Sequence, residues 1–541
     1  MQRQKWLLCV VIFIAFLSLY LLTLSHNLAA AHDSMSYLCD IDSKTWNFHP
    51  HHLLYIPFSI LWVGLLRGIG ITSDSILVIE SLNAVFGAAA VAIIFYILLE
   101  RFQNNTRTTF STIILIGCSF GFWLFSISIE VLTIPLFFLL LSLLILLRKP
   151  LRQKDLVLAG IFHGIAILCF QAHVLFVIPA LVRIIFVKEN TIYTPRTKAV
   201  IIYLIPAACI AIIGYAAVMM FSVKPTSWNE AFLWITKYAH EMSDAWTVPS
   251  LNSLKKALIG FSHSIIGGHF FFGIPWFASH VNQIFGKHEL RDEFYIVRSA
   301  SPFISEYLLS ASLLLAGCIG FIILNSLSSI KKIYSEQRPL LLPIGIWLIV
   351  YVLFFFIWDP VDFQFWIIQS MLCWVVLDRM LIHQATDHPK RTAVFRFTLP
   401  FLLLAINFFG SIIPLHNESN DYFYVQSKAL AAQTSAQDVI ITDNPWMEGD
   451  YYKRFTRNTV YSPQELTSDS LRQSFIQRIR ATVSSGGKIW LTFPIPERDT
   501  TDIVLSSFRV LWQSTIDSIS VQKTRQAIGS QEYEVVRGEN K

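Results

Sequence analysis

Apolar runs of about 17–25 residues recur along most of the chain, and each is long enough to cross a bilayer as one helix. Only 14% of the 541 residues are charged and 54% are hydrophobic, whereas soluble domains carry about 25% charged residues. The pattern predicts a polytopic α-helical membrane protein with about 11 transmembrane helices. The expected spans are 6–24, 76–99, 110–125, 131–147, 156–170, 174–187, 199–221, 304–327, 340–357, 363–381 and 397–413.

Lys and Arg gather in the short loops on one side of these spans, as cytoplasmic loops do. The segment Leu53–Leu66 is only about 14 residues long, and a crossing there would put every later basic loop on the wrong face. We therefore expect it to lie at the outer surface or to be re-entrant. The basic loops account for the net charge of +6, so no nucleic-acid partner is expected.

Two large loops, 25–75 and 222–303, fall on the outer side of a transmembrane domain that covers residues 1–413. Residues 414–541 have the composition of a soluble protein and would lie outside as well. Within them, strand-like runs alternate with a helical run. The sequence thus predicts a small extracytoplasmic α/β domain, with strands at 438–442, 488–493 and 532–536 and a helix at 470–484.

The first outer loop concentrates acids and imidazoles between residues 31 and 55. Its Asp40 and Asp42 form a DxD pair of the kind that binds a divalent metal such as Mg²⁺ or Mn²⁺, although such pairs are also common in solvated loops. Imidazole suits zinc, but two adjacent histidines cannot easily bind one ion. The candidate zinc ligands are His49, His51 and His52.

Other polar residues occupy the short turns on the same side. Glu130 lies between two apolar spans, where a carboxylate costs about 2.5–3.5 kcal/mol even on lenient scales. A functional role is therefore favoured over simple capping of the hairpin. His173 opens a later span, and Asp359 and Asp362 are equally explained as turn formers around Pro360.

The order and sidedness of these motifs resemble the GT-C superfamily of membrane glycosyltransferases. The most similar branch contains protein O-mannosyltransferases and the aminoarabinose transferases that modify lipid A. Its first outer loop has an acidic residue, then a Tyr, then a His-Pro-Pro-Leu-like motif that opens a surface helix. The matching residues here are Asp33, Tyr37 and the run Phe48–Tyr55. Glu130 resembles the second outer acidic position of the family.

The resemblance covers residues 1–200, and the later spans and the C-terminal domain match in layout only. Three departures from the family pattern stand out. Ser34 replaces a common Glu, and His51 replaces the second Pro. An Arg often precedes the second span in the family, and Glu80 and Asn83 are found there instead.

The resemblance implies transfer of a sugar from a polyprenyl-phosphate-linked donor to a lipid, glycan or protein acceptor. It makes Asp33 the first candidate for the general base, with a role as metal ligand as the alternative. Glu130 would position the acceptor or share the metal. Contacts to the substrates would come from Tyr37, His49 and His173. The outer loops themselves offer the cations that could meet the phosphate, foremost Lys255, Lys256 and Arg291, with Arg67, His263, His269 and Arg298 as further candidates. Binding of Lys255 and Lys256 to anionic membrane lipid is an equal alternative.

Two other functions remain open at this stage. A secondary transporter fits the number of spans, but its polar groups would lie at broken helices near the midplane. A non-catalytic assembly protein derived from a GT-C enzyme fits the departures at Ser34 and at the missing Arg. For an enzyme of this kind we expect the inner membrane of a bacterium, with the site and the C-terminal domain facing the periplasm.

Overall fold

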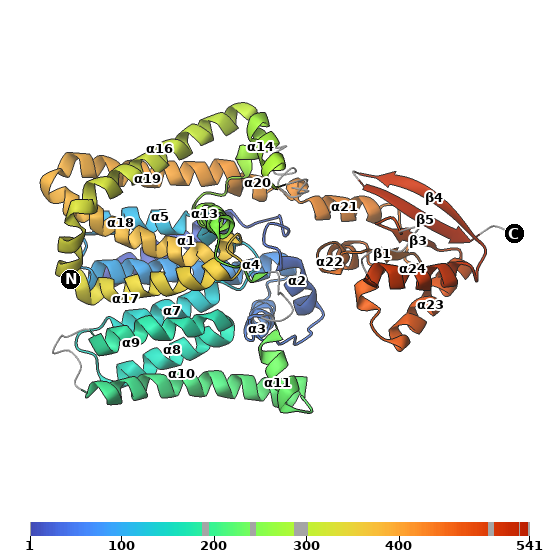
Figure 1. Cartoon of the computed structure of the whole chain (residues 1–541), viewed down its shortest axis with the longest axis horizontal. Helices are drawn as coiled ribbons and strands as arrows, with labels where there is room; N and C mark the ends of the chain where they lie inside the picture. The colour runs from blue at the N-terminus through green and yellow to red at the C-terminus, as the bar shows by residue number, and fades with distance from the viewer. Residues whose placement is uncertain are drawn as a thin grey trace. The chain divides into compact units, whose positions relative to one another are not determined.

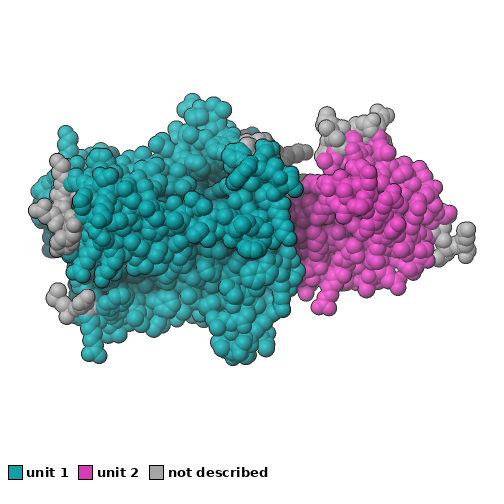
Figure 2. Space-filling view, turned by 90° about the horizontal axis from the view of Figure 1, so that it is seen from below, with its two compact units in different colours: residues 1–25, 40–288, 296–416 teal, residues 26–39, 289–295, 417–541 magenta. Residues whose placement is uncertain are grey.

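The computed structural model describes residues 2–186, 194–237, 245–285, 301–495, 503–529 and 531–538. They form two compact units, which Figure 2 shows in different colours. Unit 1 contains residues 1–25, 40–288 and 296–416, and unit 2 contains residues 26–39 and 417–541. Residues 26–39 belong to the first outer loop in sequence but fold with the C-terminal residues.

Long apolar helices that run roughly along one direction make up most of unit 1 (Figure 1). Their bounds are α1 (Gln2–Leu22), α4 (Ser75–Tyr96), α10 (Arg196–Val218), α16 (Pro302–Ser326), α17 (Ile330–Ile357), α18 (Ile367–Asp387) and α19 (Pro389–Asn407). Short π-helical or 3-10 turns extend several of them: η1 (Ile97–Arg101), η3 (Met219–Val223), η6 (Leu327–Ser329) and η8 (Phe408–Ile412).

Among the described residues, six helices are long and apolar enough to cross a membrane, or seven if one bent pair counts as a span. One of the six, Pro302–Ile357, is 56 residues long and contains both α16 and α17. The predicted class, a polytopic helical membrane protein with a small C-terminal α/β domain, is confirmed. The predicted number of spans, about 11, is not confirmed.

Shorter helices occupy the other predicted spans. They are α5 (Thr106–Gly117), α6 (Phe120–Ile127), α7 (Thr133–Leu146), α8 (Gln153–Cys169) and α9 (Val177–Phe186). The sequence predicts one span where α5 and α6 lie, but the pair is bent by 68°. The break falls at Ser119, whose extended backbone begins the second helix.

The outer loops of unit 1 are helical as well. The segment expected at the surface is α3 (Tyr55–Gly68), a helix of 14 residues. The other helices of these loops are α2 (Ser34–Asp42), which starts in unit 2, η2 (Gln171–Phe176), α11 (Trp228–Ile235), α13 (Leu251–Ile265), η5 (His269–Gly273), α14 (Pro275–Phe285) and η7 (Phe363–Trp366).

Two glycines let α8 and α10 approach closely. A Cβ added at Gly160 or Gly164 of α8 would collide with the carbonyl oxygen of Tyr203 or Ala207 on α10. Small residues four apart are typical of such contacts between membrane helices. Between the two glycines, His163 Nδ1 lies 2.8 Å from the hydroxyl of Tyr203.

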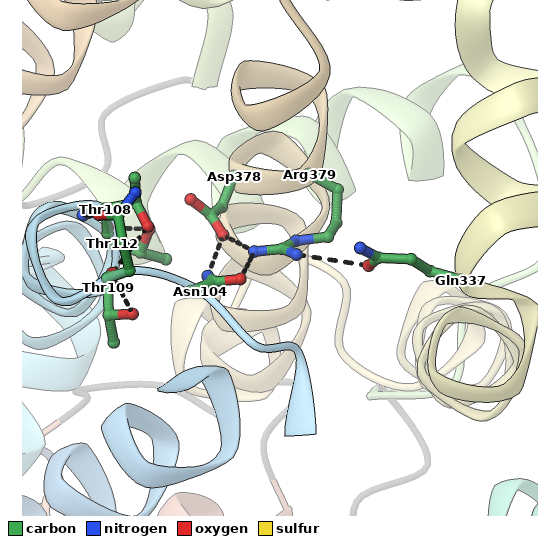
Figure 3. A network of polar contacts seen from close by, with 8 residues as sticks. Asn104, Thr108, Thr109, Thr112, Gln337, Asp378 and Arg379 are labelled. Atoms are coloured by element: carbon green, nitrogen blue, oxygen red, sulfur yellow. Dashed lines mark hydrogen bonds and ion pairs between the residues drawn. The ribbon is translucent and has the colours of Figure 1, made fainter. Parts of the chain in front are cut away.

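A buried ion pair lies beyond the end of α4 (Figure 3). Arg379 and Asp378 of α18 are paired, with 2% and 3% of their side chains exposed. Asn104, in the loop after η1, donates to Asp378 at 2.8 Å and accepts from Arg379. Arg379 also donates to Gln337 at the kink of α17, at 3.3 Å, and lies over the ring of Phe102. The network therefore joins α17, α18 and the loop after α4.

The C-terminal part of unit 2 is a five-stranded sheet in the order β2-β1-β3-β5-β4. Strands β1, β2 and β3 are parallel, and β5 is antiparallel to both β3 and β4. The strands are β1 (Val439–Ile441), β2 (Thr459–Tyr461), β3 (Lys488–Leu491), β4 (Val521–Ile528) and β5 (Gln531–Gly538). The three predicted strands are confirmed as β1, β3 and β5, while β2 and β4 were not predicted.

Helices cover both faces of this sheet. The side chains of Val439 and Ile441 point to one face, where they pack with Phe475 of α23 and Trp512 of α24. Ile440 points to the other face and packs with residues of α21 and α22, as the alternation of side chains along a strand requires. The helices are α21 (Tyr422–Ala431), α22 (Asp450–Phe455), α23 (Asp469–Ser484), which confirms the predicted helix, and α24 (Ile503–Ile516).

Candidate functional site

Asp33 and Tyr37 lie close together at the start of α2. Both belong to the segment 26–39, which is part of unit 2. The amide of Tyr37 donates to the carbonyl oxygen of Asp33 at 3.0 Å, one helical turn away. The Tyr37 hydroxyl lies 3.3 Å from Asp33 Oδ2. Asp33 is half-buried, so part of the residue stays accessible while the Tyr37 hydroxyl contacts its carboxylate.

Asp40 and Asp42 lie further along α2, where residues two apart do not share a helix face. Asp40 accepts a hydrogen bond from Asn47 at 3.0 Å, and Asp42 is exposed. Burial raises the pKa of the Asp40 carboxyl, against the opposing effects of Asn47 and His49. In the part of the chain that the structure describes, no group of three His, Cys, Asp or Glu side chains is arranged to hold a metal ion.

Glu130 is almost fully buried in the turn between α6 and α7. Its Oε1 accepts a hydrogen bond from the amide of Val131 at 2.9 Å. The side-chain nitrogen of Asn83, on α4, donates to the carbonyl oxygens of Ser128 at 2.5 Å and Glu130 at 2.6 Å, and lies 3.5 Å from the Tyr55 hydroxyl. Four polar residues from α3, α4 and this turn therefore meet at one place in unit 1.

Glu80 lies one turn before Asn83 on α4 and has no exposed surface. Neither of its carboxylate oxygens has a hydrogen-bond partner among the described residues. A buried polar group without a partner costs about 1–3 kcal/mol, and more if charged. Glu80 and Glu130 both lie close enough to Tyr55 to interact with it electrostatically, so these polar residues are neighbours in an otherwise apolar part of unit 1.

The histidines of the Phe48–Tyr55 motif form a cluster just before α3. The ring centres of His49 and His51 are 5.0 Å apart, and those of His51 and His52 are 5.5 Å apart. His51 Nδ1 lies 3.4 Å from Gln171 Oε1, an acceptor, so this nitrogen carries the proton. Burial, followed by the charge of His49, lowers the pKa of His51 to about 3. Burial and its neighbours likewise lower the pKa of His52.

A second set of aromatic and imidazole groups continues from this cluster. The ring of Phe170 stacks on His52 at 5.3 Å and meets His173 edge-on at 5.0 Å. His173 is fully buried, and its Nδ1 lies 3.0 Å from the hydroxyl of Tyr351 on α17. His163 Nε2 donates to the carbonyl oxygen of His173 at 3.0 Å. His173 is thus held from both sides, which suits a fixed positioning role.

The cations expected to meet a phosphate are less closely grouped. Lys255 is exposed and Lys256 half-exposed on α13, and Arg291 lies outside the described residues. Lys237, just after α11, was not predicted, yet its charge acts on His51 and helps to lower the pKa of that imidazole.

Asp362 caps η7 with its side chain, as expected for a turn former.

The sequence named Asp33, Tyr37, His49, Glu130 and His173, and each has polar or aromatic neighbours in the structure. It gave no role to Glu80, Asn83, His163 or Lys237. A charged or amide residue inside an otherwise apolar span, as Glu80 and Asn83 are, is a signal that could have found the first two. Lys237 has no such signal because only the fold brings it near His51.

The described residues form a bundle of apolar helices and a three-layer α/β domain, which is the layout of a polytopic membrane protein with a small α/β domain. Over its whole length the chain is similar to ArnT from Cupriavidus metallidurans in the apo state, with a TM-score of 0.56, 11% identity and 100% of each chain covered. It is also similar to the same protein bound to undecaprenyl phosphate, with a TM-score of 0.54, 12% identity, and 98% of this chain and 99% of that chain covered. No protein-family model and no curated protein match the sequence. At these identities the likeness establishes the fold.

Proposed function

We propose that this protein is a membrane glycosyltransferase that takes its sugar from a polyprenyl-phosphate-linked donor. The observation that carries the proposal is the match of the whole chain to ArnT, one structure of which is bound to undecaprenyl phosphate. The bundle and the C-terminal domain are both included in the match. The polar contacts of Asp33, Glu130 and His173, which the GT-C resemblance singles out, support the proposal.

The reaction would be a displacement at the anomeric carbon of the donor sugar. An acceptor hydroxyl or amine forms the new bond to that carbon, while the bond from the carbon to the lipid phosphate oxygen breaks. The acceptor proton passes to the carboxylate of Asp33, which the Tyr37 hydroxyl orients at 3.3 Å. The phosphate leaves with the bonding electrons and needs a cation nearby. Glu130 would position the acceptor.

A divalent metal is the alternative way to balance the charge of the phosphate, but the described residues offer no group of three ligands. Asp40 and Asp42 also lie on different sides of α2. The described residues therefore do not form a site that fits a bound divalent metal. Loss of transfer in a chelator, with recovery on addition of Mg²⁺, Mn²⁺ or Zn²⁺, would assign these carboxylates to a metal instead.

The test is sugar transfer in proteoliposomes that contain polyprenyl-phosphate sugars. The wild type is compared with Asp33→Asn, and Asp40→Asn, on the helix that follows Asp33, serves as the control. We expect the wild type to consume donor and Asp33→Asn to lose at least about a hundredfold in rate, with Asp40→Asn active. Full activity of Asp33→Asn would reject Asp33 as the base. If the wild type consumes none of a panel of donors, the transporter and assembly functions are favoured.

A further inference from the structure

The segment 26–39, which carries Asp33, folds as part of the same unit as the C-terminal domain. Its first contact is Asn27, which is fully buried. The Asn27 side-chain nitrogen donates to the carbonyl oxygen of Asn420 at 3.1 Å, and its Oδ1 accepts from the amide of Ala30 at 3.0 Å. One side chain thus shapes the turn of residues 27–30 and ties it to the residues before α21.

Asp421 makes the second and more extensive contact. Its Oδ2 accepts hydrogen bonds from the amide of Leu28 at 3.0 Å and from the hydroxyl of Tyr451 at 2.6 Å. Its Oδ1 accepts from the amide of Tyr424 at 3.0 Å and so caps α21. Only 1% of Asp421 is exposed. A single buried carboxylate therefore joins the segment before Asp33 to both α21 and α22.

Two further contacts follow along the segment. The ring of His32 meets the ring of Trp446 edge-on, with centres 6.1 Å apart. The sulfur of Cys39 lies 3.9 Å from the carbonyl oxygen of Asp450. The segment is therefore held by residues of the C-terminal domain before Asp33, next to it and after it.

We propose that Asp421 is a positioning residue for sugar transfer, acting through the segment that carries Asp33, and that holding this segment is a function of the C-terminal domain. This inference rests on the proposed function, in which Asp33 is the base. Transfer requires a base within hydrogen-bond reach of the acceptor, and a displacement of about 1 Å costs about a hundredfold in rate. Nothing in the sequence of residues 417–541 suggests such a role by itself.

The carboxylate of Asp421 fits this task in the ionised form. Burial raises its pKa to about 6, and the hydrogen bonds from Tyr451, Tyr424, Leu28 and Ala29 oppose that rise. At neutral pH the group is therefore an anion that only accepts hydrogen bonds. An amide in its place would turn a donor toward Leu28 and Tyr451 or, if flipped, toward Tyr424.

The decisive variant is Asp421→Asn in the full-length protein. Its matched control is Asp438→Asn, because Asp438 is also a buried carboxylate with several hydrogen bonds, to Ser435, Lys488 and Trp490, but within the sheet. A second variant, Asn27→Ala, breaks the same attachment from the other side without touching the C-terminal domain. Tyr451→Phe removes only one of the donors to Asp421.

Two measurements separate this inference from the proposed function. Hydrogen exchange reports on the attachment without any substrate, and we expect exchange in residues 27–33 to rise by about tenfold or more in Asp421→Asn and in Asn27→Ala. Asp438→Asn should leave exchange in this segment unchanged. In the transfer assay we expect kcat to fall by about tenfold or more in both variants, with the KM for donor within about twofold, and a smaller loss in Tyr451→Phe.

The outcomes that overturn the inference are distinct. Unchanged exchange in residues 27–33 of Asp421→Asn shows that the carboxylate does not hold the segment. Faster exchange with unchanged kcat shows that the attachment exists but does not position a catalytic group. An equal loss of kcat in Asp438→Asn shows a general need for a stable domain and also rejects the role. A wild type that consumes no donor rejects the proposed function and with it the positioning role, while the exchange data still decide whether Asp421 holds the segment.

Discussion

The side-chain nitrogen of Asn83 lies 2.6 Å from the carbonyl oxygen of Glu130, so a residue of α4 holds the turn that follows α6. The same nitrogen donates to the carbonyl oxygen of Ser128 at 2.5 Å. One side chain of α4 thus donates to two carbonyl groups on the same turn. The backbone of Glu130 is therefore held by α4, while its carboxylate accepts from the amide of Val131 within the turn.

Asn83→Leu keeps a side chain of similar size but leaves both carbonyl groups without this donor. Each buried group that loses its partner costs about 1–3 kcal/mol, so the turn should shift. We expect the rate of sugar transfer to fall by about tenfold or more, measured in proteoliposomes. Ser81→Ala is the control, since Ser81 lies on the same helix and bonds to Trp62 instead. A fully active Asn83→Leu would contradict the role of Glu130.

The low pKa of His51 predicts a loss of stability in acid. In the unfolded chain a histidine has a pKa of about 6.5, whereas in the fold the pKa of His51 is about 3. Between these values the unfolded chain binds a proton that the folded chain does not, so stability falls as the pH falls below about 6.5, by about 1.4 kcal/mol per pH unit. We expect the melting temperature to fall less between pH 7 and pH 5 in His51→Gln than in the wild type.

The control for this experiment is His280→Gln, which replaces an exposed histidine. That variant should follow the wild type across the pH range. Parallel melting curves for the wild type and His51→Gln would show that His51 is not the group that makes the fold sensitive to acid.

Lys237 is a candidate for the cation that meets the donor phosphate. It lies close enough to act on His51, and Gln171 bridges the two regions, at 3.4 Å from His51 Nδ1 and 3.2 Å from the carbonyl oxygen of Ile235. We expect Lys237→Gln to raise the KM for donor by about tenfold, with a smaller change in kcat. Lys255→Gln and Lys256→Gln test the earlier candidates in the same assay. If only these two raise the KM, the phosphate binds at α13 instead.

The ion pair of Arg379 and Asp378 predicts a large effect on stability. Removing one member of a buried pair leaves an uncompensated charge and costs about 3–5 kcal/mol. We expect Arg379→Met to lower the melting temperature of the detergent-purified protein strongly. The double variant with Asp378→Leu removes both charges and should recover part of the loss. A single variant as stable as the wild type would show that Asn104 alone can compensate Asp378.

The fold was predictable to the extent that it depends on local pattern. The lengths of the apolar runs predicted the helices, and short strand-like runs predicted β1, β3 and β5. The bend at Ser119 was not predictable, because hydropathy does not depend on backbone conformation and one extended residue inside an apolar run does not change it. Strand β4 was not predicted because its sequence, VQKTRQAI, has few apolar residues, and most of this edge strand is exposed.

The candidate site was predictable where short motifs carry it, as at Asp33 and Glu130. It was not predictable where the tertiary fold brings distant residues together. The contact of Asn83 with the Glu130 turn spans 47 residues, and that of His173 with Tyr351 spans 178. The role of Asp421 belongs to the same class, since an aspartate before a helix is by itself an ordinary cap.

The bond between Asp421 and Leu28 joins residues 393 positions apart, and this separation has a consequence for biogenesis. A ribosome that adds about 5–20 residues per second needs roughly 20 to 80 seconds to make the intervening chain. Throughout that time the early helices can insert into the membrane, but the segment with Asp33 has no partner to fold on. Under the proposed function, a newly made chain would hold Asp33 in place for transfer only after residues 417–541 have been synthesised and folded.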